Sequence, residues 1–306
     1  MTETSERTLP LPTGRVARWL QFAKERFDPL SHLLMIGLFF WVHQILAQRL
    51  ARGDAWRSGL LLVGTLAFFF KLRLYDEIKD FETDSALNPS RPLVRGLLAH
   101  RDLHRGIVGC IAIELVTFGL SGSAALLSIV WAIGYSLLMY REFFIGRWIR
   151  PHLTTYAVSH TVVSVWLSLA LFVALTARPV WELPRGLLLF SLGNWCLFNI
   201  FEFGRKTFTS AEEREGVESY SKIFGRTGAV LLLLVMGAAS SYLLSGLDEA
   251  TSGRLFWAIG GVLGAIAITG SLYAIRDCAG GIYRAASSLY IVLVYATLLI
   301  FHYAAW

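Results

Sequence analysis

The chain has 306 residues, of which 55% are hydrophobic and only 16% are charged, and its mean hydropathy is +0.54. A soluble domain of this size would carry about a quarter charged residues. The composition therefore excludes an ordinary soluble protein and predicts an all-α, polytopic membrane protein. The formal net charge of +6 suits basic loops near an anionic membrane surface. Because no basic residues gather in a soluble domain, we expect no nucleic-acid partner.

The first 27 residues lack the apolar core of a secretory signal peptide. We expect them to form a cytoplasmic tail and a basic interfacial helix over residues 16–27, at the start of one domain covering residues 1–306. A spanning helix needs about 20 mostly apolar residues. Nine segments fit this requirement: 31–48, 58–75, 106–121, 123–140, 154–176, 184–203, 227–245, 255–275 and 284–304. The short link between the third and fourth predicts an antiparallel helix pair.

The basic residues predict the orientation, because cytoplasmic loops of membrane proteins carry an excess of Lys and Arg. With the N-terminus inside, 20 of the 28 Lys and Arg residues lie in cytoplasmic segments and six lie in outer ones. Lys71 and Arg73 fall near the inner end of the second span, where long side chains can reach the interface. Both long polar connections, residues 76–105 and 204–226, are therefore predicted to face the cytoplasm.

An acidic run follows the second span directly. If the helix continues, Glu77, Asp80 and Asp84 share one face, and Asp76 lies on nearly the same face. Carboxylates so close repel one another unless a cation lies between them, and Mg²⁺ binds through a few carboxylates together with substrate phosphates. Arg91 and Arg95 follow, and arginines form bidentate contacts with phosphate oxygens. The alternative is a solvated acidic helix end, neutralised by Lys79 and by an Arg73–Glu77 pair.

The same stretch resembles the first signature of the UbiA superfamily of intramembrane prenyltransferases, N-D-x-x-D-x-x-x-D followed by R-P-L-x-x-G. The matching residues are Asp80, Asp84, Arg91, Pro92, Leu93 and Gly96. Asp76 stands where the family has Asn and Glu77 where it has Asp, and both changes keep oxygen ligands. The resemblance implies nine transmembrane helices, acidic loops on the cytoplasmic side, and Mg²⁺ held by Asp76, Glu77, Asp80, Asp84 and Glu202.

The second acidic motif of the family, D-x-x-x-D, would lie at the end of the sixth span. Here Glu202 takes the first acidic position and Lys206 the second. Asn199, Glu202 and Lys206 repeat the i, i+3, i+7 spacing of Glu77, Asp80 and Asp84, so we expect the two helix ends to face each other across one cavity. An ammonium cannot bind Mg²⁺, but it can contact diphosphate directly. The alternative is a simple helical pair between Glu202 and Lys206.

Further basic and hydroxyl groups at this side are candidate contacts to the diphosphate. They are Arg205, Tyr220, Lys222 and Arg141, besides Arg91, Arg95 and Lys206. Glu114 falls inside the third span, where a charge is costly. It is expected either to line the cavity or to form a bond within the bundle.

The resemblance implies ionisation of an isoprenyl diphosphate in a central, lipid-accessible cavity, with Asp80, Asp84, Glu202 and Lys206 as the catalytic group. The prenyl group would pass to a lipophilic or aromatic acceptor. The first alternative is a terpene cyclase of the same superfamily, which uses the prenyl diphosphate alone. A transporter is a less favoured alternative, because the charges cluster at helix ends rather than at broken helices near the midplane. A phosphoalcohol transferase is disfavoured because no D-G-x-x-A-R element precedes Asp80.

Overall fold

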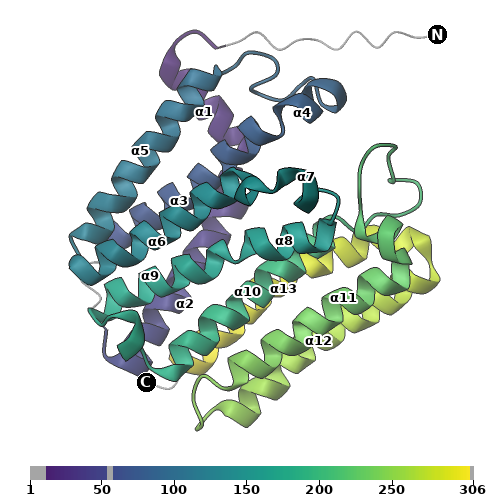
Figure 1. The fold of residues 1–306 in the computed structure, drawn as a ribbon. Helices are drawn as coiled ribbons and strands as arrows, with labels where there is room; N and C mark the ends of the chain where they lie inside the picture. Colours follow the sequence, from purple (N-terminus) through teal and green to yellow (C-terminus); the bar gives the residue numbers. More distant parts are fainter. Residues whose placement is uncertain (1–11, 54–57, 304–306) are drawn as a thin grey trace, which may run out of the picture.

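The computed structural model describes residues 12–53 and 58–303, and its regular elements in these ranges are all helical (Figure 1). The α-helices are α1 (Arg15–Arg26), α2 (Pro29–Ala51), α3 (Ser58–Lys79), α4 (Phe81–Leu87), α5 (His100–Gly119), α6 (Ser123–Tyr140), α7 (Gly146–Ile149), α8 (Leu153–Thr161), α9 (Val163–Thr176), α10 (Arg185–Arg205), α11 (Tyr220–Ser245), α12 (Ser252–Ile275) and α13 (Gly280–Tyr303). Short 3₁₀ turns cover Glu142–Phe144, Val180–Glu182 and Asp277–Ala279.

Each of the nine predicted spans forms a helix, which confirms the all-α polytopic fold. Within the described ranges, eight helical segments are long and apolar enough to cross a membrane: α2, α3, α6, α8 with α9, α10, α11, α12 and α13. The ninth helix of the bundle, α5, is less apolar because it contains Arg101, Asp102, Arg105 and Glu114. The protein is therefore an integral membrane protein. The predicted span 154–176 is divided at Val162 into α8 and α9.

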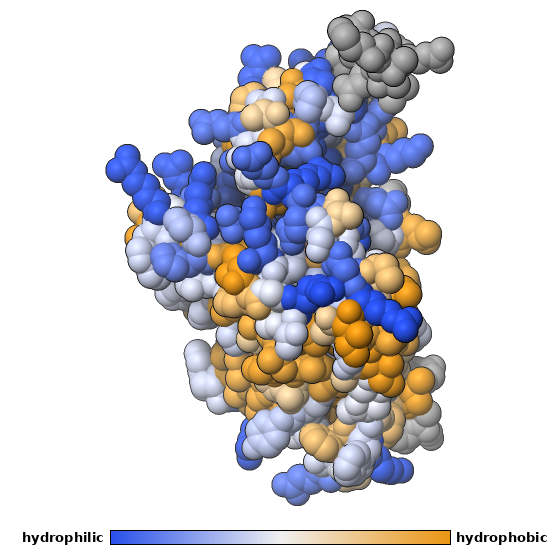
Figure 2. Space-filling model, turned by 90° about the vertical axis from the view of Figure 1, so that its right-hand side faces the viewer, coloured by the Kyte–Doolittle hydropathy of each residue, from blue (hydrophilic) through white to orange (hydrophobic). Residues whose placement is uncertain are grey.

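The helices form a closed ring of neighbours. In order, α2, α3, α5, α6, α9, α10, α11, α12 and α13 each contact the next, and α13 contacts α2. Helix α10 also contacts α13, and α2 also contacts α9, so the ring has contacts between helices that are not consecutive in it. Figure 2 shows a hydrophobic belt on the face of α11 and α12, with hydrophilic residues gathered at both ends of the molecule. This distribution is what a bilayer-spanning bundle requires.

One end of the bundle carries α1, α4, α7 and the connection 206–219 (Figure 1). The amphipathic α1 matches the predicted interfacial helix and packs on this end through Phe22, whose ring meets Phe70 of α3 edge to face. Trp19 approaches α5 so closely that a Cβ on Gly106 would lie 2.7 Å from the indole ring. A larger residue at position 106 would therefore force the indole ring to shift.

Candidate active site

The first half of the site is the end of α3. The helix stops at Lys79, and α4 begins at Phe81 after a bend at Asp80. Backbone hydrogen bonds nevertheless continue across the bend, from the Asp80 N–H to the Asp76 carbonyl (2.9 Å) and from the Asp84 N–H to the Asp80 carbonyl (2.7 Å). Asp76, Asp80 and Asp84 therefore keep the one-turn spacing that the sequence predicted, despite the bend.

Glu77 has a different environment from these aspartates. It is buried, and its Oε2 accepts a 2.6 Å hydrogen bond from Arg26 Nε at the end of α1. Its Oε1 accepts a 3.1 Å bond from the Leu93 N–H. Both carboxylate oxygens thus bind protein groups, and they join α1, α3 and the 88–99 connection. The Arg73–Glu77 pair, which belonged to the alternative of a solvated helix end, does not form; Arg73 Nη1 lies 3.3 Å from Asp76 Oδ2 instead.

The two arginines of the first motif lie differently. Arg91 Nε is 3.5 Å from Asp84 Oδ1, which also accepts a 2.8 Å hydrogen bond from Asn88. Arg95 is directed to α1, where its Nη2 lies 2.7 Å from Glu25 Oε1. The structure therefore brings Arg91 to the aspartates, whereas Arg95 holds α1. The turn between them and α5 uses Gly96 with φ of 77°, a conformation that favours glycine.

The second half of the site is the end of α10. Glu202 receives two hydrogen bonds from Arg205, at 2.6 and 2.8 Å, and Lys206 Nζ lies 3.1 Å from its Oε1. The helical pair considered as an alternative for Glu202 and Lys206 therefore exists, and Arg205 joins it. Two cations around one carboxylate leave this helix end with net positive charge, which suits a phosphate ligand.

Tyr220 anchors the connection that follows α10. Its N–H donates to the Lys206 carbonyl (3.0 Å), its ring packs on Phe203, and its hydroxyl donates to the Leu153 carbonyl (3.3 Å). Because the side chain is fully buried, it fixes the position of Lys206. Lys222 is exposed and shows no interaction with the other candidates among the described residues.

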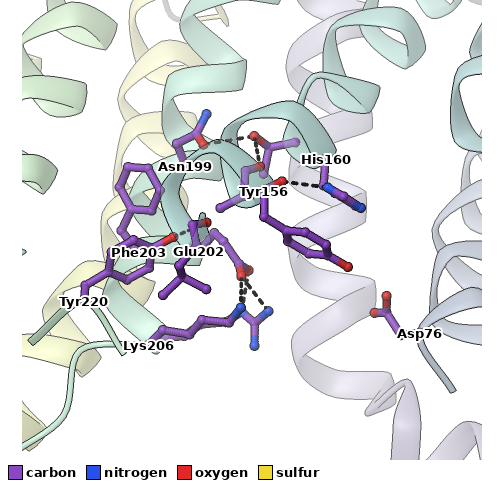
Figure 3. A network of polar contacts seen from close by, with 12 residues as sticks. Asp76, Tyr156, His160, Asn199, Glu202, Phe203, Lys206 and Tyr220 are labelled. Carbon is purple, nitrogen blue, oxygen red and sulfur yellow. Dashed lines mark hydrogen bonds and ion pairs between the residues drawn. The ribbon is translucent and has the colours of Figure 1, made fainter. Parts of the chain in front are cut away.

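The two helix ends face each other, as their matching spacing predicted. Burial raises the pKa of Asp80 to about 6; the like charge of Asp76 adds to this shift, while Lys79 and, across the gap, Lys206 oppose it. Asp80 nevertheless keeps solvent-accessible surface. A side chain is both accessible and strongly desolvated when protein surrounds it on several sides without covering it. In Figure 3, Asp76 lies across from Glu202 and Lys206.

The first residue of each i, i+3, i+7 set, Glu77 and Asn199, has a structural role. Asn199 is buried; its Oδ1 accepts from the Thr161 hydroxyl (2.9 Å) and its Nδ2 donates to the Trp195 carbonyl (2.9 Å). Thr161 lies where α8 meets α9, so Asn199 stabilises that break. Glu77 binds Arg26 and Leu93 in the corresponding position of the first motif. In both helix ends the first polar residue of the motif therefore binds protein groups. The later charged residues differ in burial: Asp80 is exposed, Glu202 and Lys206 are partly exposed, and Asp84 is buried.

The sequence did not identify Lys79, Tyr156 and His160 as site residues. Lys79 Nζ donates a 2.6 Å hydrogen bond to the Tyr156 hydroxyl and lies 3.4 Å from His160 Nε2. Tyr156 and His160 stack with ring centroids 3.8 Å apart. Tyr156 lies within electrostatic range of Asp76, and His160 within range of Glu202, so α8 lies beside both halves of the site. The i, i+4 spacing of Tyr156 and His160 at the start of a span was the available signal.

The loop between α6 and α8 contributes a further residue that the sequence missed. Arg141, the predicted candidate, ends α6 and is exposed. The next residue, Glu142, is buried, binds Arg150 Nε at 2.8 Å, and lies within electrostatic range of Lys79. Glu142 and the two residues after it have φ between 51° and 59°, the left-handed region that non-glycine residues rarely adopt.

Lys71 and Glu114 form a separate ion pair between α3 and α5. Lys71 Nζ lies 2.6 Å from Glu114 Oε2, and both side chains are fully buried. Of the two alternatives for Glu114, the bond within the bundle is the one that forms. The expectation that Lys71 reaches the membrane interface is wrong, because the carboxylate of α5 compensates its charge inside the bundle.

Comparisons with known proteins identify the fold. No family model and no curated protein matches the sequence. The structure is similar to that of a digeranylgeranylglyceryl phosphate synthase, with a TM-score of 0.60 and 13% identity over 92% of this chain and 98% of that one. It is also similar to the apo structure of a UbiA homolog from Aeropyrum pernix K1, with a TM-score of 0.56 and 18% identity over 88% of this chain and 97% of that one. The chain has the UbiA fold.

The UbiA fold confirms the family resemblance that the motif suggested, at the level of architecture. In this fold, the aspartates of α3 and the cations of α10 occupy one end of the helix ring. Among residues 12–53 and 58–303, no three His, Cys, Asp or Glu side chains form a ready metal cluster. Mg²⁺ commonly uses one or two carboxylates and completes its shell with water and substrate phosphates. Asp76 and Asp80, whose side chains keep solvent-accessible surface, fit such a partial site.

Aromatic rings lie below the charged end in this UbiA-type bundle. Phe69, two turns before Asp76, stacks with Phe198, one turn before Glu202, at a centroid distance of 6.1 Å. Phe39 meets both rings edge to face. Phe69 and Phe198 are only partly buried although they face each other between α3 and α10. Their π-faces are placed to contact an apolar or cationic group beneath the charges.

Proposed function

We propose that this protein is a membrane prenyltransferase that ionises an isoprenyl diphosphate and transfers the prenyl group to a lipophilic or aromatic acceptor. The observation that carries the proposal is the opposition of two charged helix ends in a UbiA fold. Asp76 and Asp80 provide acidic oxygens at the end of α3, and Arg205 and Lys206 provide cations at the end of α10. A diphosphate between them would contact a metal ion on the aspartate side and the Arg205 and Lys206 cations on the other side.

Each residue of the proposed diphosphate site has its own role. Asp76 and Asp80 would hold Mg²⁺, and Asp84 positions Arg91 toward the phosphates. Bound Mg²⁺ would neutralise the charge that develops on the leaving diphosphate. Arg205 and Lys206 contact the diphosphate from the other side, with Glu202 orienting them. Both cations become more effective as negative charge develops at the bridging oxygen.

The prenyl chain would extend from the charged end toward Phe69 and Phe198. These rings lie one to two helical turns deeper, or about 6–11 Å along the helix axis. An allylic cation formed when the carbon–oxygen bond breaks would then face aromatic π-systems in a dry environment. The acceptor attacks this carbon and loses a proton. We also propose that the charged end faces the cytoplasm, since 20 of the 28 Lys and Arg residues fall in the sequence segments assigned to that side.

The test is diphosphate release by the purified full-length protein with geranyl, farnesyl and geranylgeranyl diphosphate plus Mg²⁺, each with and without aromatic and lipid acceptors. We expect release that depends on an acceptor and a prenylated product. Asp80→Asn is expected to abolish release, whereas Glu82→Gln, an exposed carboxylate of the same acidic run, should retain it. Cyclic products without an acceptor would show a terpene cyclase instead. Full activity of Asp80→Asn would contradict the site.

A further inference from the structure

A second, basic site lies outside the helix ring, between α1 and α5. Two adjoining cavities of about 340 and 300 Å³ share Arg15, Trp19 and Asp102 in their walls. Arg18 and Arg101 complete the first cavity and Arg105 the second. Volumes of this size fall at the lower end of the roughly 300–1,000 Å³ that small-ligand sites occupy. None of these residues belongs to the diphosphate site described above.

The charge in these cavities is unbalanced. The four arginines face one carboxylate, Asp102, whose Oδ2 already accepts a 3.2 Å hydrogen bond from the Ala99 N–H. Across residues 12–53 and 58–303, no carboxylate forms an ion pair with Arg15, Arg101 or Arg105. Arg18 uses its Nε to bind the Pro12 carbonyl (3.1 Å). Grouped guanidinium groups repel one another unless an anion lies among them, and they match phosphate in geometry.

The surroundings favour a lipid as the carrier of that phosphate. On α1, Val16 and Leu20 follow Arg15 and Trp19 by one residue and are 74% and 67% exposed. On α5, Val108 lies one turn beyond Arg105 and is 66% exposed. On both helices, exposed apolar side chains therefore lie within one turn of residues that line the basic cavities. Trp19, between them, is typical of the boundary between headgroups and acyl chains.

We propose that the α1–α5 cavities bind the phosphate-bearing headgroup of an acidic membrane lipid. The guanidinium groups of Arg101 and Arg105 contact the phosphate from α5, and Arg15 and Arg18 contact it from α1. The acyl chains lie along the apolar surface of Val108 and α1. Basic pockets between helices on the cytoplasmic side of membrane proteins recognise anionic headgroups in this way. The bound lipid would hold α1 on the bundle.

The test uses the purified full-length protein in neutral detergent and measures binding of three probes by calorimetry: dihexanoyl phosphatidylglycerol, dihexanoyl phosphatidylcholine and inorganic phosphate. We expect phosphatidylglycerol to bind at least tenfold more tightly than either other probe. Arg101→Gln with Arg105→Gln should weaken this binding about 30-fold, which corresponds to about 2 kcal/mol for two basic residues. Arg147→Gln with Arg214→Gln removes the same charge from exposed positions and should change it less than twofold.

Three results would overturn the proposal. If phosphatidylglycerol does not bind, or if it binds both double variants with equal affinity, these arginines do not form a lipid site. Inorganic phosphate that binds as tightly as the lipid would show a free-anion site and exclude the lipid assignment. The thermal unfolding midpoint of each variant without lipid checks that loss of binding is not loss of folding.

Discussion

Lys79 Nζ donates a 2.6 Å hydrogen bond to the hydroxyl of Tyr156, which joins the first acidic motif on α3 to α8. The same ammonium lies 3.4 Å from His160 Nε2 and near Asp76 and Asp80. Lys79 therefore lies where α8 approaches the end of α3 and the carboxylates of Asp76 and Asp80. It was visible in the sequence only as a neutralising charge within the motif.

Removing this link should impair the proposed reaction without unfolding the protein. Tyr156→Phe deletes the hydroxyl that positions Lys79, and we expect diphosphate release to fall about tenfold, since a hydrogen bond to a charged group contributes about 1.5–3 kcal/mol. Steady-state release assays measure this change. Tyr135→Phe, which loses a hydroxyl bonded to the Ser159 carbonyl, serves as the matched control. An equal loss in both variants would argue against a specific role for Tyr156.

Asp80 should give the protein a dependence on pH near its raised pKa of about 6. Because the neutral form is favoured in the folded state, Asp80 is mostly protonated below pH 6 and ionised above it. Mg²⁺-dependent binding of a diphosphate should therefore weaken as the pH falls from 7 to 5, and titration calorimetry across this range measures it. The outcome that contradicts the assignment is binding that does not change with pH in this interval.

The same shift has the opposite consequence for folding. Folding raises the pKa of Asp80 from the ordinary aspartate value of 3.8 to about 6. The folded state therefore loses stability as the pH rises from 3.8 to 6, and this loss remains above pH 6. Asp80→Asn removes the penalty, so we expect its unfolding midpoint to exceed the wild-type value at pH 7.5 and to approach it at pH 4. A thermal-shift series without Mg²⁺ tests this, and a lower midpoint at pH 7.5 would refute it.

Glu77 should behave as a structural residue. Glu77→Ala leaves Arg26 without its buried partner and the Leu93 N–H without an acceptor. We expect it to destabilise α1 and the 88–99 connection by about 2–4 kcal/mol, which limited proteolysis of the N-terminal region and the unfolding midpoint both measure. Glu25→Ala, which breaks the more exposed pair with Arg95, should cost at most about 1 kcal/mol. Equal effects of the two substitutions would exclude the special role of Glu77.

Lys206 should act on the leaving diphosphate rather than only on Glu202. Lys206→Met removes one of the two cations beside Glu202 but keeps the length of the side chain. We expect the KM for the isoprenyl diphosphate to rise and the maximal release rate to fall, about 10–100-fold in kcat/KM, in line with the loss of one charged contact. Lys206→Asp restores the acidic residue of the motif, and a gain in Mg²⁺-dependent activity would mean that Lys206 substitutes imperfectly for a metal ligand.

Substituting Lys71 or Glu114 alone should destabilise the protein more than substituting both together. Lys71→Met or Glu114→Gln alone leaves a buried charge uncompensated, which costs about 3–5 kcal/mol. The double variant removes both charges, and we expect it to recover most of the loss. Unfolding midpoints of the four proteins complete a double-mutant cycle. A double variant as unstable as the sum of the singles would mean that the two groups do not interact.

The sequence by itself determined the helices and their membrane location, because apolar runs of about 20 residues have few stable alternatives in a bilayer. It also placed Asp76, Asp80, Asp84, Glu202 and Lys206 at helix ends, since helical spacing is local and readable. The resemblance to the UbiA superfamily was carried by the residues of the first motif, including Arg91, Pro92, Leu93 and Gly96.

Only the tertiary structure decided which polar groups meet. Glu77 and Asp80 look alike in the sequence, yet the docking of α1 gives Glu77 an arginine partner and leaves Asp80 open. Likewise, Lys79 meets Tyr156 only because the bundle brings α3 and α8 together. A charged side chain takes its role from the partners that surround it, and partners 51 or 77 residues away are set by packing rather than by local sequence.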